Sequence, residues 1–222
     1  DKEGFCSVIM EGRGIPAKGA FPSSFTYGND AVETVSYDPE EAKKLLEESG
    51  WTDTDGDGYA DKDGQKLSIN WLTYPTRLEQ PKLAEYAQAT LKDIGIDVVV
   101  NNTSDHMTIA KSGDFDVYVS STTTAPTGDP EYFFTSTVTG AKNYGKYQNE
   151  EVTKLTDQLH QTFDKDERAK LAVELQQDIL DDDAFFFVSH LNMGIVTKSN
   201  VTGMAAHPCD YYEICLLYTS PS

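Results

Sequence analysis

Between residues 37 and 119 the sequence alternates between helical and strand periodicity, and this alternation constrains the fold more than any other feature. The expected helices span residues 38–49, 81–94 and 104–111, and the expected strands span residues 67–71, 96–100 and 115–119. Strands that are separated by helices need crossover connections, which place neighbouring strands parallel. The pattern therefore predicts an α/β fold with a mostly parallel sheet and helices on both faces.

The first of these helices carries clear start and stop signals. Asp38 stands at the N-cap position, Pro39 at the first helical position and Glu41 at the capping-box spacing. Gly50 follows the last turn as a C-terminal stop. We expect Trp51 to fold back onto the apolar stripe of this helix.

The flanking regions have other patterns. Residues 1–36 are rich in Gly and Pro, which predicts an ordered connector rather than a helix. After the sheet, the expected elements are helices over 150–163 and 165–181 with Asp164 capping the second, a buried strand over 184–188, and a short strand over 193–196.

Composition limits the function. The chain has 37 acidic and 18 basic residues and a formal net charge of −19. Such a surface repels phosphate backbones and anionic membranes, so we expect no nucleic-acid partner. The three cysteines, Cys6, Cys209 and Cys215, form no CxxC pair and no disulfide framework.

An acidic loop follows the first helix. Asp53, Asp55 and Asp57 alternate ahead of Gly58, as in the first half of a calcium-binding EF loop. The twelfth position of such a loop should be Glu, and here it is Gly64. A tight acidic turn is the structural alternative, and a calcium-stabilised extracellular module is the functional one.

Catalytic motifs are not found. The four histidines form no HExxH, and no GxSxG, P-loop or GxGxxG occurs. A hydrolase that uses clustered carboxylates stays an alternative without a recognisable constellation. We therefore expect a protein that is not an enzyme.

The segment from Ser120 to Phe134 is rich in hydroxyl and aromatic side chains. It follows the carboxyl end of a predicted strand, where ligands of open α/β sheets bind. Hydroxyls and aromatics suit a small polar ligand. A plain loop with a helix N-cap at Asp129 and Pro130 is compatible with the same residues.

Several segments in succession carry a family resemblance. The segment 37–51, the Asp-Gly loop after it, the segment 124–130, the segment 143–152 and the connector 12–17 occur in the order typical of one family. The chain resembles the dipeptide, oligopeptide and nickel family of extracytoplasmic solute-binding proteins of ABC importers, and its nickel or metal-chelate branch above all. Members of that family close two lobes around a solute.

The resemblance implies a fragment of a longer protein. Residues 37–199 would form most of the second lobe, while 1–36 and 200–214 would be edges of the first lobe. Residues 215–222 resemble neither the family nor a periodic pattern, and we expect a non-native or disordered tail. The signal peptide would lie outside this chain.

The resemblance also implies where the ligand binds. In nickel binders of the family a Tyr soon after the Ala-Pro pair and a later His face the chelate, but here Thr127 or Gly128 and then Lys142 or Asn143 occupy those places. Lys142 and Asn143 would suit a carboxylate. His207, next to Cys209, is the remaining metal candidate. The expected ligand contacts are Thr124, Thr127, Lys142, Asn143, Tyr144 and His207.

The expected function is the capture of a peptide, nickel or a metal chelate for delivery to an ABC permease. No cofactor is required, because a metal would be the cargo. The resemblance further implies a monomer in the periplasm, or one anchored to the outer surface of a membrane.

Overall fold

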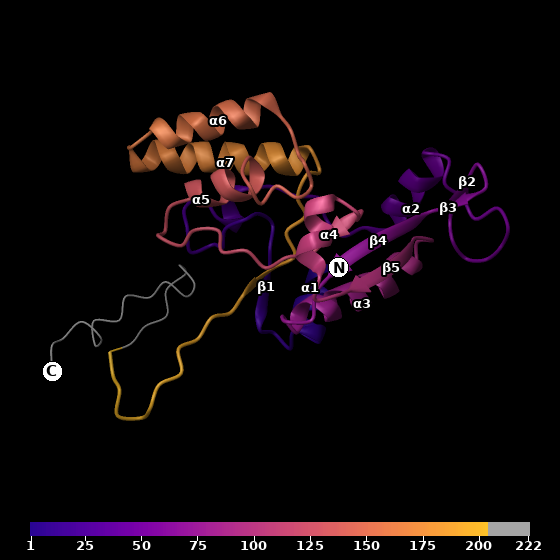
Figure 1. The fold of residues 1–222 in the computed structure, drawn as a ribbon, viewed down its shortest axis with the longest axis horizontal. Helices are drawn as coiled ribbons and strands as arrows, with labels where there is room; N and C mark the ends of the chain where they lie inside the picture. Colours follow the sequence, from indigo (N-terminus) through magenta and orange to yellow (C-terminus); the bar gives the residue numbers. More distant parts are fainter. Residues whose placement is uncertain (204–222) are drawn as a thin grey trace. The chain divides into compact units, whose positions relative to one another are not determined.

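The computed structural model describes residues 1–203, and these form two compact units (Figure 1). The first unit contains residues 1–12 and 35–121, and the second contains residues 13–34 and residues from 122 onwards. The expected second lobe at 37–199 spans parts of both units. The assignment of lobes therefore stays a prediction, as does the nature of residues 200–214 and 215–222.

The first unit is built on a three-stranded parallel sheet with the order β5-β4-β6. The strands are β4 (Ser68–Thr73), β5 (Asp97–Asn102) and β6 (Val117–Tyr118). β4 lies in the middle and pairs with β5 from Ser68 opposite Asp97 onwards. The predicted α/β fold with a parallel sheet is confirmed.

The helices of this unit agree with the predicted pattern. They are α2 (Pro39–Glu48), α3 (Glu79–Lys92) and α4 (His106–Ser112). The carboxylate of Asp38 accepts the Glu41 N–H at 3.0 Å, as the capping signal predicted. α3 packs on β5 and β4, and its Ala84 is fully buried. α2 buries none of its residues within the described chain.

The start of the chain differs from the prediction. Residues 1–36 were expected to contain no helix, but α1 (Lys2–Gly4) leads into a π-helical turn at Phe5–Ile9. The Asp1 carboxylate accepts the Gly4 N–H at 2.7 Å, and the Phe5 ring packs against Tyr86 of α3. The cap at Asp1 and the burial of Phe5 therefore stabilise a short helical segment despite the Gly and Pro content of residues 1–36. The predicted non-helical connector begins only at Gly12.

The second unit is mainly helical. Its elements are a 3₁₀ turn at Asn29–Ala31, α5 (Glu131–Phe133), a π-helical turn at Phe134–Val138, α6 (Glu150–Gln161) and α7 (Lys165–Asp181). Asp164 caps α7, as predicted, by accepting the N–H groups of Asp166 and Glu167. α6 and α7 pack together around Leu159, Leu175 and Ile179, which are fully buried.

The expected strand at 184–188 is wrong in position. The strand β7 covers Ser189–Leu191 and pairs antiparallel with β1 (Gly14–Pro16). A separate antiparallel hairpin of β2 (Asp61–Lys62) and β3 (Gln65–Lys66) belongs to the first unit. Phe185 and Phe187 pack on the core of the second unit, but Phe186 between them is 66% exposed. The apolar run thus alternates in burial, and Val196 at 98% exposure forms no strand either.

Candidate functional site

The predicted threonine contacts lie on a tight turn of the second unit. The Gly128 N–H donates to the Ala125 carbonyl at 3.0 Å, and Ala125 is only 3% exposed. Thr127 stands exposed on this turn, and Thr124 before it is half-buried. The Tyr27 hydroxyl donates to the Gly128 carbonyl at 2.7 Å. A buried anchor and a hydrogen bond therefore hold a turn that presents a hydroxyl to solvent.

The predicted cation lies on a second loop of the same unit. Lys142 is exposed, and its Nζ lies 3.0 Å from the Tyr132 hydroxyl and 5.2 Å from the centre of the Tyr132 ring. Tyr144, which is half-buried, donates its backbone N–H to the Lys142 carbonyl at 2.9 Å. The contact with Tyr132 thus positions the Lys142 ammonium group, which stays accessible to solvent.

The amide of Asn143 has a structural role. Its Nδ2 donates to the Tyr147 carbonyl at 2.8 Å, and its Oδ1 accepts the Tyr147 N–H at 2.9 Å. This closed pair shapes the loop from Asn143 to Tyr147. A contact between Asn143 and a ligand stays a prediction, as do the contacts of the other predicted residues. His207, together with Cys209, lies outside the described residues.

An ion-pair network that sequence reasoning missed connects the turn to α7. Arg168 Nε and Nη2 donate to the two carboxylate oxygens of Asp129 at 2.9 and 2.7 Å. Nη2 also donates to Glu131 at 2.9 Å, and the Arg168 side chain is only 13% exposed. No periodicity singles out Arg168, because its partners lie far from it in the sequence.

Glu131 also pairs with an exposed histidine. His160 Nδ1 lies 2.6 Å from Glu131 Oε1, and the His160 side chain is 71% exposed. The hydrogen bond from His160, and then that from Arg168, holds the pKa of Glu131 below its ordinary value. Glu131 is therefore held in its charged form within this network.

In the first unit, aromatic side chains gather at the carboxyl end of the parallel sheet. The ring of Tyr74, which directly follows β4, stacks on His106 at 4.1 Å, and His106 Nδ1 lies 2.9 Å from the hydroxyl of Tyr118 on β6. His106 is the first residue of α4, within the helix expected over residues 104–111. The rule that ligands bind at strand carboxyl ends could have singled out Tyr74 from the sequence.

Buried polar groups lie around the same sheet edge. Gln80, which is 4% exposed, donates from Nε2 to the Ser121 hydroxyl at 2.7 Å, while its Oε1 has no partner within the described residues. Thr73 at the end of β4 is fully buried, and its hydroxyl likewise has no partner there. These groups are candidates for hydrogen bonds to water or to a ligand.

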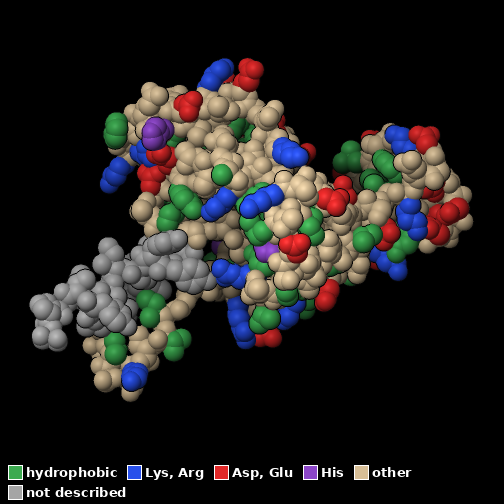
Figure 2. Space-filling model, viewed as in Figure 1, with side chains coloured by type: hydrophobic (Ala, Val, Ile, Leu, Met, Phe, Trp, Pro, Cys, Tyr) green, Lys and Arg blue, Asp and Glu red, His purple; other side chains and the backbone are tan. Residues whose placement is uncertain are grey.

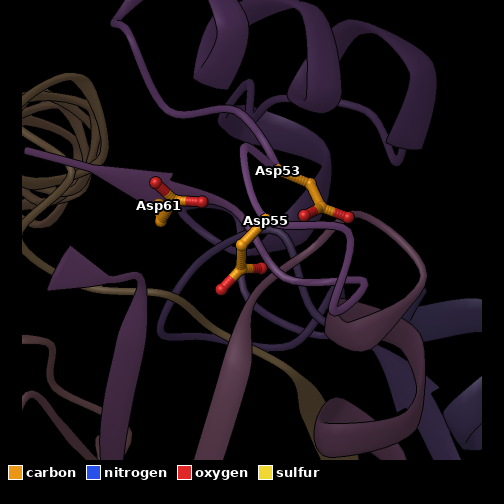
Figure 3. A group of neighbouring side chains, drawn as sticks. All are labelled: Asp53, Asp55 and Asp61. Atoms are coloured by element: carbon orange, nitrogen blue, oxygen red, sulfur yellow. The ribbon is translucent and has the colours of Figure 1, made fainter. Parts of the chain in front are cut away.

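The acidic loop brings three carboxylates together, although with a different third member than predicted (Figure 3). Asp53, Asp55 and Asp61 each place an oxygen within 4.8 Å of the others, whereas Asp57 forms an ion pair with Lys66 at 2.5 Å. The same carboxylates accept loop N–H groups, as when Asp53 accepts those of Gly56 and Gly58. The calcium site therefore stays a prediction beside a self-bonded acidic turn.

Charged side chains of both signs lie on the face shown in Figure 2. Acidic and basic side chains are interspersed on the visible face rather than collected in one patch (Figure 2). None of the helices in residues 1–203 combines the length and the hydrophobicity that a membrane span requires.

The sequence matches a known family. The pattern of the bacterial extracellular solute-binding proteins, family 5 Middle, matches residues 1–145. The oligopeptide-binding protein AppA of Bacillus subtilis is 30% identical over 96% of this chain, and the nickel-binding protein NikA of Staphylococcus aureus is 27% identical over 96%. The chain spans 41% and 42% of the lengths of these relatives.

Solved structures agree with this relation. The AppA structure from Bacillus subtilis in complex with a nonapeptide superposes with a TM-score of 0.75 at 26% identity, covering 94% of this chain and 43% of that one. NikA from Staphylococcus aureus in complex with Ni(L-His)2 gives 0.76 at 25% identity, with the same coverage of 94% and 43%. The chain belongs to family 5 of the bacterial extracellular solute-binding proteins.

Proposed function

We propose that this chain is part of the solute-binding component of an ABC importer, which captures a small solute and delivers it to a membrane permease. The observation that carries this proposal is the match over 96% of the chain to an oligopeptide-binding and a nickel-binding protein. Binding without catalysis is the proposed activity. Membership in an extracellular family supports a location outside the cytoplasm, and membrane anchoring is part of the proposal.

The proposed solute is a peptide, nickel or a metal chelate, with the metal as cargo rather than as cofactor. The relatives include binders of both kinds, since one is solved with a nonapeptide and another with Ni(L-His)2. The exposed Lys142 ammonium supports a carboxylate-bearing solute, because both peptides and amino-acid chelates carry carboxylates. The nickel branch, direct metal ligation by His207 and a monomeric state belong to the same proposal.

The proposed mechanism follows from the solute-binding family. The solute enters between two lobes of the longer protein, and contacts that form only in the closed state shift the population towards closure. Thr124 and Thr127 would supply hydroxyl contacts, and Lys142 and Tyr144 would supply a charge and an aromatic ring. The closed form is then presented to the permease.

Calorimetric titration of the longer protein that contains this chain tests the proposal. We expect saturable binding of either a nonapeptide or a nickel–histidine complex, and weaker binding by a Lys142→Ala variant. Thr153→Ala, which removes a surface hydroxyl on α6, serves as a control with unchanged affinity. Absence of heat with both probes, at concentrations where the relatives' ligands would bind, contradicts the proposal.

A further inference from the structure

The turn that carries Thr127 is held at several points, all of them in the second unit. Ala125 is buried, the Gly128 carbonyl accepts the Tyr27 hydroxyl, and Gly128 itself adopts a left-handed backbone with φ of 78°. The next residue, Asp129, accepts the N–H of Glu131, the first residue of α5, at 2.9 Å. The exit of the turn is therefore fixed by the carboxylate of Asp129.

Arg168 uses its entire donor capacity in this place. A guanidinium group has five N–H donors, and five hydrogen bonds leave Arg168. Two of them form a bidentate pair with Asp129, one reaches Glu131, and two reach the carbonyls of Leu159 and Thr162. Arg168 thus joins the end of α6 and the start of α7 to the exit of the turn.

Because the Arg168 side chain is largely buried, the loss of any of these hydrogen bonds is costly. Its side chain is 13% exposed, so water cannot replace the lost partners at low cost. The planar fork matches a carboxylate through two parallel bonds, which a lysine ammonium cannot reproduce. The two bonds to Leu159 and Thr162 go to the α6–α7 connection. The bidentate pair instead acts on the turn.

We propose that Arg168 is a positioning residue for solute binding, which acts through Asp129 to hold the turn from Thr124 to Asp129 in its binding arrangement. The inference rests on the proposed function, because it assumes that this turn contacts the solute. A turn that is already ordered loses little conformational entropy when a ligand arrives. A turn released from Arg168 must be ordered at the moment of binding, and affinity falls accordingly.

The test uses Asp129→Asn in the longer protein. The amide keeps the size of the side chain and leaves the Arg168 bonds to Glu131, Leu159 and Thr162 in place, but it offers only one acceptor oxygen to the two parallel donors of Arg168, and its NH2 group faces the other donor. We expect the dissociation constant for the probe that the unmodified protein binds, a nonapeptide or a nickel–histidine complex, to rise about tenfold. Arg168→Lys should give a similar rise, and the double variant should be no weaker than the weaker single variant, since both changes break one clamp.

A second readout separates positioning from plain destabilisation. Hydrogen exchange of the Gly128 amide, which is bonded to Ala125, should accelerate in Asp129→Asn. The control Asp38→Ala removes the N-cap of α2 in the first unit and lowers stability, but it should leave both the affinity and the exchange of the turn unchanged.

The outcomes separate the two levels of the argument. An unmodified protein that binds neither probe contradicts the proposed function, and the inference falls with it. An unmodified protein that binds a probe, with the same affinity and the same exchange in Asp129→Asn, overturns the role of Arg168 alone. Affinity losses of the two single variants that add fully in the double variant also overturn it, because they would show independent effects.

Discussion

At the residue scale, the partly buried side chain of His190 makes the stability of the second unit depend on pH. His190 on β7 places Nε2 3.1 Å from Asn29 Oδ1, and the same oxygen accepts the Lys18 N–H at 2.9 Å. Burial lowers the pKa of His190 from 6.5 to about 4. The folded state therefore contains neutral His190 over most of the acidic range.

This burial predicts a pH dependence of stability. At pH values well above 6.5 both states hold neutral His190, and its contribution to stability is fully present. As the pH falls from 6.5 towards 4, the unfolded chain takes up the proton first, so the contribution of His190 to the free energy of unfolding drops by about 2 kcal/mol between pH 7 and pH 4.5. Urea unfolding at both pH values measures this drop. His190→Gln should show a drop smaller by about that amount, and parallel pH profiles of the two proteins would contradict the account.

The loop from Lys142 to Tyr147 gives a second prediction at this scale. Asn143→Ala removes two hydrogen bonds to Tyr147 and should lower the free energy of unfolding by about 1–2 kcal/mol. Lys142→Ala should change it far less, because the ammonium is exposed and its one hydrogen bond goes to a surface hydroxyl. Thermal unfolding of both variants is the measurement. Equal losses would mean that the amide pair does not shape the loop.

At the element scale, one buried side-chain amide on α7 forms hydrogen bonds to both ends of the segment from Ala20 to Tyr27. Gln176 is fully buried, accepts the Ala20 N–H at 3.0 Å and donates to the Tyr27 carbonyl at 2.7 Å. Gln177, next to it, makes the same kind of pair with the backbone of Glu33, but at the surface. The two neighbours thus form a matched comparison of buried and exposed amides.

Gln176→Leu should lower the free energy of unfolding by about 3 kcal/mol, because it leaves a buried N–H and a buried carbonyl without partners. Gln177→Leu should cost less than about 1 kcal/mol, since water can take over its exposed bonds to Glu33 and Asp181. Urea denaturation distinguishes them. Similar losses in both variants would indicate that the segment from Ala20 to Tyr27 does not depend on this amide.

The acidic loop is the second element whose contribution to the free energy of unfolding can be tested. Asp61 accepts both the N–H and the hydroxyl of Thr54, at 2.8 and 2.6 Å. Asp61→Ala should therefore lower the free energy of unfolding by about 1 kcal/mol, and Asp57→Ala, which removes an exposed ion pair with Lys66, should cost less. Melting curves with calcium and with chelator accompany these variants. If the turn is only self-bonded, chelator leaves the melting temperature unchanged, whereas a shift of several degrees would support the calcium site.

At the scale of the whole molecule, the elements were predictable where local signals agree with packing. The helix at Pro39 begins after its predicted cap, α7 has its predicted bounds, and β4 and β5 lie within a residue or two of the expected strands. The strand predicted from Ala184 to Val188 is wrong because Phe185 and Phe187 are packed on the core while the segment pairs with no strand in residues 1–203. Hydrophobic periodicity in a sequence indicates which side chains are buried, but backbone hydrogen bonds to a neighbouring segment determine whether a strand forms.

The candidate site was predictable only in part. Hydroxyls and a cation could be singled out from composition and from the family resemblance, but the clamp between Arg168 and Asp129 joins residues 39 positions apart. Asp57 was assigned to the acidic cluster by spacing alone, while the hairpin of β2 and β3 brings Asp61 there and gives Asp57 to Lys66. Pairings of this kind depend on tertiary contacts, which one sequence does not encode as a local pattern.

The central claim is that the chain belongs to a protein that holds a solute, and native mass spectrometry of the longer protein, purified without denaturation, tests it most directly. The account predicts a population heavier than the polypeptide by a peptide, a metal ion or a metal chelate. That extra mass should disappear on denaturation and return on titration with a nonapeptide or a nickel–histidine complex. A single species at the polypeptide mass that takes up neither probe would contradict the account.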